Sequence, residues 1–121
     1  MSAELDAAGI TSESLRQSYL ECKRLNAKHG KTYFLATKLL PPAKRPFVHA
    51  LYGFARYADE IVDDLASTLT PEQKRQWLTE WSSTILSDIR AGRSSDAIGM
   101  ALIDTINRWE IPHRYFEASC I

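Results

Sequence analysis

The stretch of sequence that decides the fold is Arg45-Pro-Phe-Val-His-Ala-Leu-Tyr-Gly-Phe-Ala-Arg-Tyr-Ala-Asp-Glu-Ile-Val-Asp-Asp64. At about 100° per residue, a helix over this stretch carries two opposed faces. The apolar face comprises Phe47, Leu51, Phe54, Ala58, Ile61 and Leu65, and the other face comprises Arg45, Val48, Tyr52, Arg56, Asp59 and Asp63. A helix with partners on more than one side is expected to lie at the centre of its fold. Its polar face is then expected to line a cavity or meet water, because buried unpaired charge is costly.

The polar face of this helix carries a pattern that suits a metal ion. Asp59 and Asp63 lie four residues apart, so an isolated helix would pay a few tenths of a kcal/mol for their repulsion. Mg²⁺ prefers oxygen ligands and commonly bridges one or two carboxylates to phosphate groups, so the pair predicts a site for a phosphorylated substrate. Arg56 and Tyr52 continue the face with a guanidinium for anionic oxygens and an aromatic ring. Ordinary solvated charge is the alternative interpretation of the pair.

Composition restricts the chain to one ordinary globular domain. The 121 residues are 45% hydrophobic and 25% charged, with 15 basic and 15 acidic residues, so no positive excess supports binding to nucleic acid. Cys22 and Cys120 lie too far apart to suggest a zinc site or a disulfide framework. No secretory leader and no run of about 18 apolar residues is evident. We therefore expect a cytoplasmic protein and leave membrane-surface association open.

Helical signals recur along the whole chain. The long helix is expected over about 42–65. The others are expected from a cap at Thr11 or Ser12 to Gly30, over 33–40, from Thr70-Pro71-Glu72-Gln73 to Ala91-Gly92, and from a cap at Ser94 or Ser95 to Ile111-Pro112. Pro41-Pro42 separates the second helix from the long one. The start of the chain is expected to be loose. The predicted fold class is all-α.

Several other side chains carry smaller expectations. Asp88, Asp96 and Asp104 recur at spacings of eight and are expected to be surface charges. His49 lies close to the polar face and is expected to be a satisfied histidine beside the site. The three tryptophans, Trp77, Trp81 and Trp109, are expected to anchor the core.

Two linked motifs resemble those of a known family. The run Ala50-Leu-Tyr-Gly-Phe-Ala-Arg-Tyr-Ala-Asp-Glu-Ile-Val-Asp-Asp64 resembles the first aspartate-rich motif of the squalene/phytoene synthase family. The run His29-Gly-Lys-Thr-Tyr-Phe-Leu-Ala-Thr-Lys-Leu-Leu-Pro41 is similar to that family's His-x-Lys-Ser-Phe segment, which ends in Leu-Pro. The resemblance spans roughly 29–116. It implies a partial isoprenoid-synthase-type helical bundle with the aspartate-rich helix at its centre, and it makes residues 1–121 a single truncated domain, the N-terminal portion of such a fold.

The resemblance also implies an activity and roles for individual residues. Family members are prenyltransferases that join two prenyl diphosphates head to head. The positions that match the family are Asp59 and Asp63 as Mg²⁺ ligands, Tyr52 and Arg56 as catalytic residues that contact substrate, and His29, Lys31, Thr32, Tyr33 and Arg45 as further substrate-binding residues. Thr32 replaces the usual Ser and keeps a hydroxyl, and Tyr33 replaces the usual Phe. Tyr33, Phe34 and Tyr52 are candidates for the aromatic lining of a cavity that protects a carbocation from water.

The preferred reaction is phytoene formation from two geranylgeranyl diphosphates, as in carotenoid biosynthesis. The alternatives are condensation of farnesyl diphosphate to squalene or dehydrosqualene, and a non-catalytic helical module that binds a partner or a prenyl lipid. NADPH is expected only for squalene formation. The family carries a second aspartate-rich motif that this sequence lacks, so residues 1–121 alone are expected to be inactive. The apolar face of the long helix is then expected to be exposed and to favour association.

Overall fold

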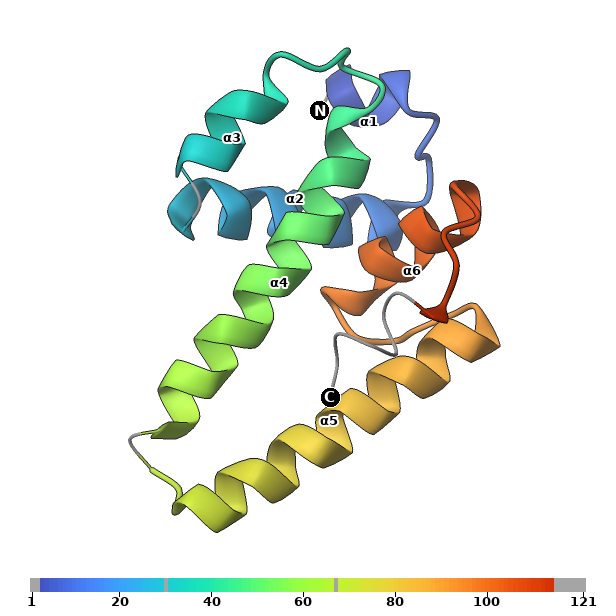
Figure 1. The fold of residues 1–121 in the computed structure, drawn as a ribbon. Helices are drawn as coiled ribbons and strands as arrows, with labels where there is room; N and C mark the ends of the chain where they lie inside the picture. The colour runs from blue at the N-terminus through green and yellow to red at the C-terminus, as the bar shows by residue number, and fades with distance from the viewer. Residues whose placement is uncertain (1–2, 30, 67, 115–121) are drawn as a thin grey trace.

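The computed structural model of the chain describes residues 3–29, 31–66 and 68–114, without the side chains of residues 29, 31–33, 62, 65 and 66. Within these ranges the helices are α1 (Ala3–Ala7), α2 (Glu13–His29), α3 (Lys31–Thr37), α4 (Arg45–Ala66), α5 (Pro71–Ala91) and α6 (Gly99–Arg108) (Figure 1). No strand occurs in the described part of the chain. The all-α fold class is therefore confirmed.

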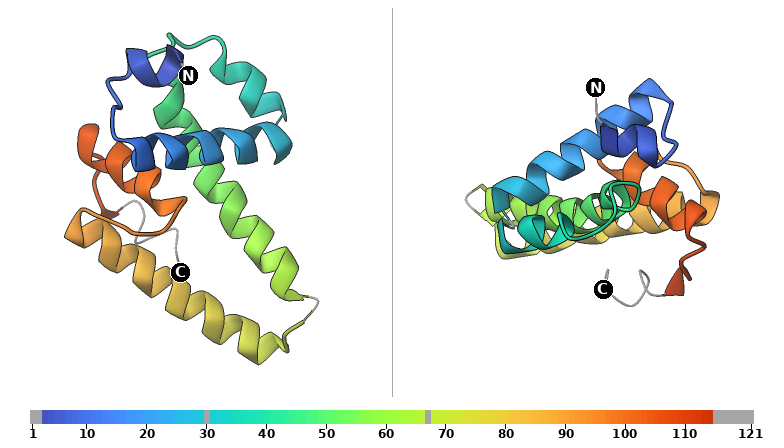
Figure 2. Two further views of the ribbon diagram at one scale, coloured as in Figure 1. Left: turned by 180° about the vertical axis from the view of Figure 1, so that it is seen from behind. Right: turned by 90° about the horizontal axis from the view of Figure 1, so that it is seen from above.

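Helix α4 is the centre of this arrangement. It contacts each of the other five helices, and α2 crosses it near its N-terminal half (Figures 1 and 2). Helix α5 turns back from the end of α4 at an open angle, and α6 packs against α2, α4 and α5. The central position predicted for the aspartate-rich helix is therefore confirmed.

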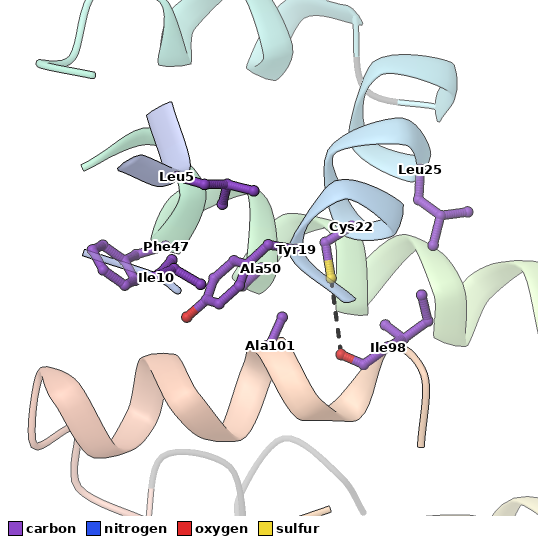
Figure 3. Packing of buried hydrophobic residues seen from close by; sticks show 9 residues of the cluster. All are labelled: Leu5, Ile10, Tyr19, Cys22, Leu25, Phe47, Ala50, Ile98 and Ala101. Carbon is purple, nitrogen blue, oxygen red and sulfur yellow. Dashed lines mark hydrogen bonds between the residues drawn. The ribbon is translucent and has the colours of Figure 1, made fainter. Parts of the chain in front are cut away.

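Two hydrophobic clusters surround α4. The first contains Leu5, Ile10, Tyr19, Cys22, Leu25, Phe47, Ala50, Ile98 and Ala101, most of which face one another between α2, α4 and α6 (Figure 3). The second contains Ile85, Ile89, Leu102, Ile103 and Ile106, which join α5 to α6. Phe54 packs against both clusters, and its ring stacks on Trp81 with centroids 5.5 Å apart.

From Phe47 to Ile61, the described part of the apolar face of α4 is covered rather than exposed, which corrects the expectation from the sequence. Phe47 is 8% exposed, and Leu51 and Phe54 are half-buried against α5 and α6. Among the described residues, the most exposed large apolar side chains are instead Leu35 in α3 and Leu39 just after it.

The predicted helix boundaries hold where the signal is local. Thr70 and Gln73 form the reciprocal capping box at the start of α5, and Gly92 ends that helix with a φ of 76°. Helix α4 begins at Arg45 rather than at residue 42, because residues 42–44 form a turn in which the Lys44 amide donates to Pro41 O.

The described start of the chain is helical from residue 3, which corrects the expectation of a loose start, and the three scattered aspartates are half-buried and accept hydrogen bonds. Leu5 in α1 is buried at 2% exposure. Asp96, rather than a serine, accepts the Ile98 and Gly99 amides before α6, at 3.0 and 2.7 Å. The other two aspartates accept hydrogen bonds from hydroxyl groups: Asp88 from Ser94 at 2.9 Å, and Asp104 from Tyr19 at 2.6 Å.

The tryptophans differ in their burial. Trp77 and Trp81 are half-buried and stacked on each other, with centroids 6.2 Å apart. Trp109 packs its ring edge against Phe47 but is 51% exposed, so it anchors the core only in part. In the described ranges, none of the helices has the length and apolar character needed to cross a bilayer.

Candidate functional site

The rotation of α4 about its own axis is set by a close approach to α2 at Gly53. A Cβ atom at Gly53 would lie 2.5 Å from Cys22 O and 2.6 Å from Cys22 Cα, closer than any side chain tolerates. Ala50, one turn earlier on the same face, is fully buried. With this small-residue face against α2 and Phe54 against α5, the face that carries Tyr52 is left pointing outward.

The polar face of α4 is an open surface. Tyr52 is 41% exposed, the Asp59 side chain is 72% exposed, and Asp63 is exposed as well. Arg56 Nη1 lies 3.8 Å from Asp59 Oδ2, which makes an ion pair within one turn of the helix. We call Tyr52, Arg56, Asp59 and Asp63 the polar stripe. The sequence left open whether this face lines a cavity or meets water. Among the described residues, the face is exposed to solvent.

The stripe fits half of a Mg²⁺ site. Asp59 and Asp63 supply carboxylate oxygens from successive turns, and Mg²⁺ takes six ligands that commonly include waters and substrate phosphates. In the described part of the chain, no group of three or more His, Cys, Asp or Glu side chains is placed to hold a metal ion. The remaining ligands would therefore have to come from substrate and water, as is usual for this ion.

An ion pair brings the two sequence motifs to the same side of the molecule. Lys28 Nζ, in the last turn of α2, lies 3.5 Å from Glu60 Oε1 of α4, the neighbour of Asp59. Both side chains are partly exposed, so the pair adds little stability. The pair matters because it shows that the C-terminal end of α2 lies close to Asp59, in the C-terminal half of the polar stripe.

Four of the predicted substrate-binding residues lie where α2 ends and α3 begins. They are His29, Lys31, Thr32 and Tyr33, whose side chains lie outside the description. Phe34, the next residue, is half-buried and stacks on His49 with ring centroids 5.6 Å apart. Phe34 therefore packs on a buried side chain, and its assignment to a cavity lining stays a prediction.

Arg45 shares a face with the stripe in sequence, and in the structure it bonds to other parts of the chain. Its guanidinium donates to Leu40 O and Lys38 O, each at 2.9 Å, and to Glu4 Oε2 at 3.3 Å. Glu4 also accepts from Lys23 at 2.7 Å. Asp59 comes fourteen positions after Arg45, so the two lie about 21 Å apart along the helix. Arg45 therefore joins α1 and the turn after α3 to α4.

The charged and polar groups near Arg45 shift one another's pKa values. Desolvation works against the charge on Glu4, yet its hydrogen bonds with Lys23 and Arg45 leave the pKa of this carboxyl below its usual value. His49 is 2% exposed, and burial is the main cause that lowers its pKa to about 4. Its Nδ1 accepts from Asn26 Nδ2 at 3.0 Å, which suits a neutral ring. Asn26 Oδ1 is buried and has no hydrogen-bond partner among the described residues. We call Glu4, Lys23, Asn26, Arg45 and His49 the buried polar cluster, in which Asn26 and His49 are buried and the other three side chains are partly exposed.

Sequence reasoning missed Gly53 and this cluster for different reasons. A glycine inside a helix costs about 1 kcal/mol relative to alanine, so Gly53 was itself a signal of close backbone approach. The partners of Arg45 and His49 come from segments 41 and 23 residues away. No local pattern predicts such pairings.

Comparison with known proteins identifies relatives of this chain. The profile described as squalene/phytoene synthase matches residues 26–120, which include both motifs. The chain is 36% identical over 99 residues to the 15-cis-phytoene synthase of Synechocystis sp., which is 81% of this chain and 28% of that relative. It is 36% identical over 95 residues to the phytoene synthase of Arthrospira platensis, which is 78% of this chain and 29% of that relative. It is also 35% identical over 98 residues to the chloroplastic phytoene synthase of Narcissus pseudonarcissus, which is 80% of this chain and 22% of that relative. The chain thus spans less than a third of the length of these curated relatives.

Proposed function

The chain belongs to the squalene/phytoene synthase family, and from this premise we propose that it acts in the head-to-head joining of two prenyl diphosphates. Phytoene formation from geranylgeranyl diphosphate is the preferred reaction, because the relatives compared above carry the name phytoene synthase. The observation that carries the proposal is the outward stripe on α4 with the end of α2 beside it.

In this proposal each residue of the stripe has a defined task. Asp59 and Asp63 would hold Mg²⁺ together with the diphosphate, and Arg56 would donate to a phosphate oxygen. When bound, the metal withdraws charge from the leaving diphosphate and so eases cleavage of the allylic carbon–oxygen bond. Tyr52 offers its ring to the hydrocarbon beside that bond, where a ring face contributes about 0.5–2 kcal/mol to a neighbouring cation.

The open stripe also determines what else the reaction needs. An allylic cation must be kept from water, whereas Tyr52 is 41% exposed. A second diphosphate calls for a second carboxylate set. We therefore place the facing wall and that second set outside the described residues, on further chain or on a partner chain. On this basis the 121 residues alone bind substrate without turning it over.

Binding of a non-hydrolysable geranylgeranyl diphosphate analogue tests the stripe directly. Titration calorimetry of the purified chain is expected to show binding that requires Mg²⁺. Asp59→Asn and Asp63→Asn should each remove the Mg²⁺ dependence, whereas Glu80→Gln, which removes an exposed carboxylate from α5, should leave it unchanged. Equal binding with and without Mg²⁺, or unchanged binding in both aspartate variants, would show that these carboxylates are only solvated.

Product analysis separates the alternatives. In the preferred reaction, assembly with a chain that supplies the second carboxylate set yields phytoene from geranylgeranyl diphosphate without a reductant. Squalene from farnesyl diphosphate and NADPH would assign the alternative reaction. The lack of a second acidic cluster in the described residues favours, as a further candidate, a helical module that binds prenyl lipid or a partner without chemistry. Turnover by the isolated chain would exclude that candidate and the incomplete-site proposal together.

Membrane contact is also part of the proposal. The substrates and the hydrocarbon product carry long prenyl chains that partition into bilayers. An enzyme that acts on them therefore meets its substrates and releases its product most directly at a bilayer surface.

A further inference from the structure

The segment after α3 is held in place by polar bonds rather than by burial of its apolar side chains. Arg45 binds the carbonyls of Lys38 and Leu40, and the amides of residues 38, 39 and 40 each donate to the carbonyl three residues earlier. Thr37 is 3% exposed and donates its hydroxyl to Phe34 O at 2.6 Å. The backbone of residues 35–44, which we call the α3 tip, is therefore well anchored.

In the α3 tip, apolar side chains are exposed and a polar side chain is buried, the reverse of the usual pattern in globular proteins. Leu39 is 88% exposed and Leu35 is 62% exposed, while the polar hydroxyl of Thr37 between them is buried. Elsewhere among the described residues, the exposed large apolar side chains reach only 37% for Leu20 and 51% for Trp109. An anchored segment that presents two leucines is pre-organised for contact, because its backbone need not be ordered on binding.

Positive charge accompanies these leucines. Lys38 and Lys44 are exposed on the α3 tip, and Lys38 Nζ lies 5.3 Å from the centre of the Phe34 ring. Residues 22–58 contain eight Lys and Arg residues and no Asp or Glu, although the whole chain has no formal net charge. Acidic residues outside this band pair with several of its cations: Glu4 with Lys23 and Arg45, Glu21 with Arg24, Glu60 with Lys28, and Asp59 with Arg56. The tip itself carries no carboxylate.

We propose that the α3 tip docks on an anionic lipid surface, with Leu35 and Leu39 entering the acyl boundary and Lys38 and Lys44 contacting the headgroups. A stable protein interface buries about 1,000 Å² or more, whereas the exposed apolar residues of the α3 tip are few: Leu35, Ala36, Leu39, Pro41 and Pro42. Shallow membrane binding needs only a few apolar side chains together with cations. This inference adds a location to the membrane contact in the proposed function. Vesicle binding is measured without substrate or Mg²⁺, so its failure leaves the transferase proposal untouched.

Co-sedimentation of the 121-residue chain with vesicles tests the docking surface. Binding is expected to phosphatidylcholine vesicles that contain phosphatidylserine, and to be weaker on pure phosphatidylcholine or at high salt. The double variant Leu35→Ser/Leu39→Ser should lower the partition coefficient at least tenfold. Lys38→Gln/Lys44→Gln should lower it about fivefold per lysine and reduce its salt dependence.

Matched variants away from the α3 tip serve as controls. Leu20→Ser removes an exposed leucine from α2, and Lys74→Gln/Arg75→Gln removes two cations from α5. Both should bind vesicles like the unmodified chain, and circular dichroism should show equal helix content in every variant. The proposal is overturned if anionic vesicles do not bind the chain or if the tip variants bind normally. It is also overturned if the leucines instead mediate self-association, seen in sedimentation velocity without vesicles and lost in the leucine variant.

Discussion

The two halves of α4 carry the same residue types, an arginine paired with a carboxylate, in different roles. In the first half, Arg45 lies 3.3 Å from Glu4, and the two side chains are 24% and 16% exposed. In the second half, Arg56 lies 3.8 Å from Asp59, whose side chain is 72% exposed. Arg45 bonds to two other segments of the chain, α1 and the turn after α3, whereas Arg56 pairs with a carboxylate of its own helix. Charge in the buried polar cluster is committed to holding helices together, and charge in the polar stripe remains accessible to a ligand.

Among the substitutions, the largest expected effect on stability comes from the contact that separates the two surfaces. Gly53→Ala places a methyl group within 2.7 Å of three Cys22 atoms, two of them backbone. We expect it to lower the free energy of unfolding by about 2–3 kcal/mol, despite alanine's better helix propensity. The reverse exchange Ala55→Gly, at an exposed position two residues away, should cost only about 1 kcal/mol. Urea unfolding measures both, and equal costs would mean that α2 and α4 tolerate a wider separation.

The buried polar cluster should make folding pH-dependent. His49 has a pKa of about 4 in the folded chain and about 6.5 when unfolded, so the unfolded state binds the proton more readily. Its contribution is complete above pH 6.5 and is lost as the pH falls toward 4, about 3 kcal/mol in all. Glu4 facing His49 from α1 favours the charged ring, while Lys23 from α2 and Arg45 on α4 oppose it.

Urea unfolding at a series of pH values checks this loss. His49→Gln should flatten the slope between pH 6.5 and 4 and leave the weaker decline at lower pH that follows from the lowered pKa of Glu4. An unchanged slope in this variant would mean that His49 is readily protonated in the folded chain.

The two arginines of α4 give the most direct comparison of its halves. Arg45→Gln should cost about 1–3 kcal/mol, because it leaves Glu4 and two carbonyl groups short of a donor. Arg56→Gln should cost less than about 1 kcal/mol, as is usual for an exposed pair within one helix. Thermal melts of the two variants give this ranking. A reversed order would mean that the stripe, rather than the cluster, holds the fold together.

The smallest effect on stability belongs to the predicted metal ligands. Asp63→Asn relieves a like-charge contact with Asp59 and should stabilise the chain by a few tenths of a kcal/mol without metal. Added Mg²⁺ with a prenyl diphosphate analogue should raise the melting temperature of the unmodified chain but not of this variant. Clear destabilisation by Asp63→Asn without metal would indicate a structural carboxylate and remove the distinction between the two halves.

The sequence predicted those features whose signals are local. The box at Thr70 and the stop at Gly92 depend on residues within one turn of each other, and the apolar face through Phe47 and Phe54 follows from helical period. The pairing of Arg45 with Glu4 depends on a helix that composition gave no reason to expect. Periodicity placed Tyr52, Arg56, Asp59 and Asp63 on one face but could not say what covers that face, because exposure depends on the packing of other helices. Their assignment to metal and substrate stays a prediction.

The close approach at Gly53 also gives the protein a built-in reporter. Cys22 lies beneath that contact with no exposed surface, and burial is the main cause that raises the pKa of its thiol to about 12. The sulfur lies 3.9 Å from Ile98 O, so a disulfide reagent can reach it only while α2 is separated from its neighbours, and the labelling rate measures how often that happens. In a chain with Cys120 replaced by serine, that rate would measure how often α2 separates transiently from its neighbours. It would also show whether a ligand on the polar stripe makes these separations rarer.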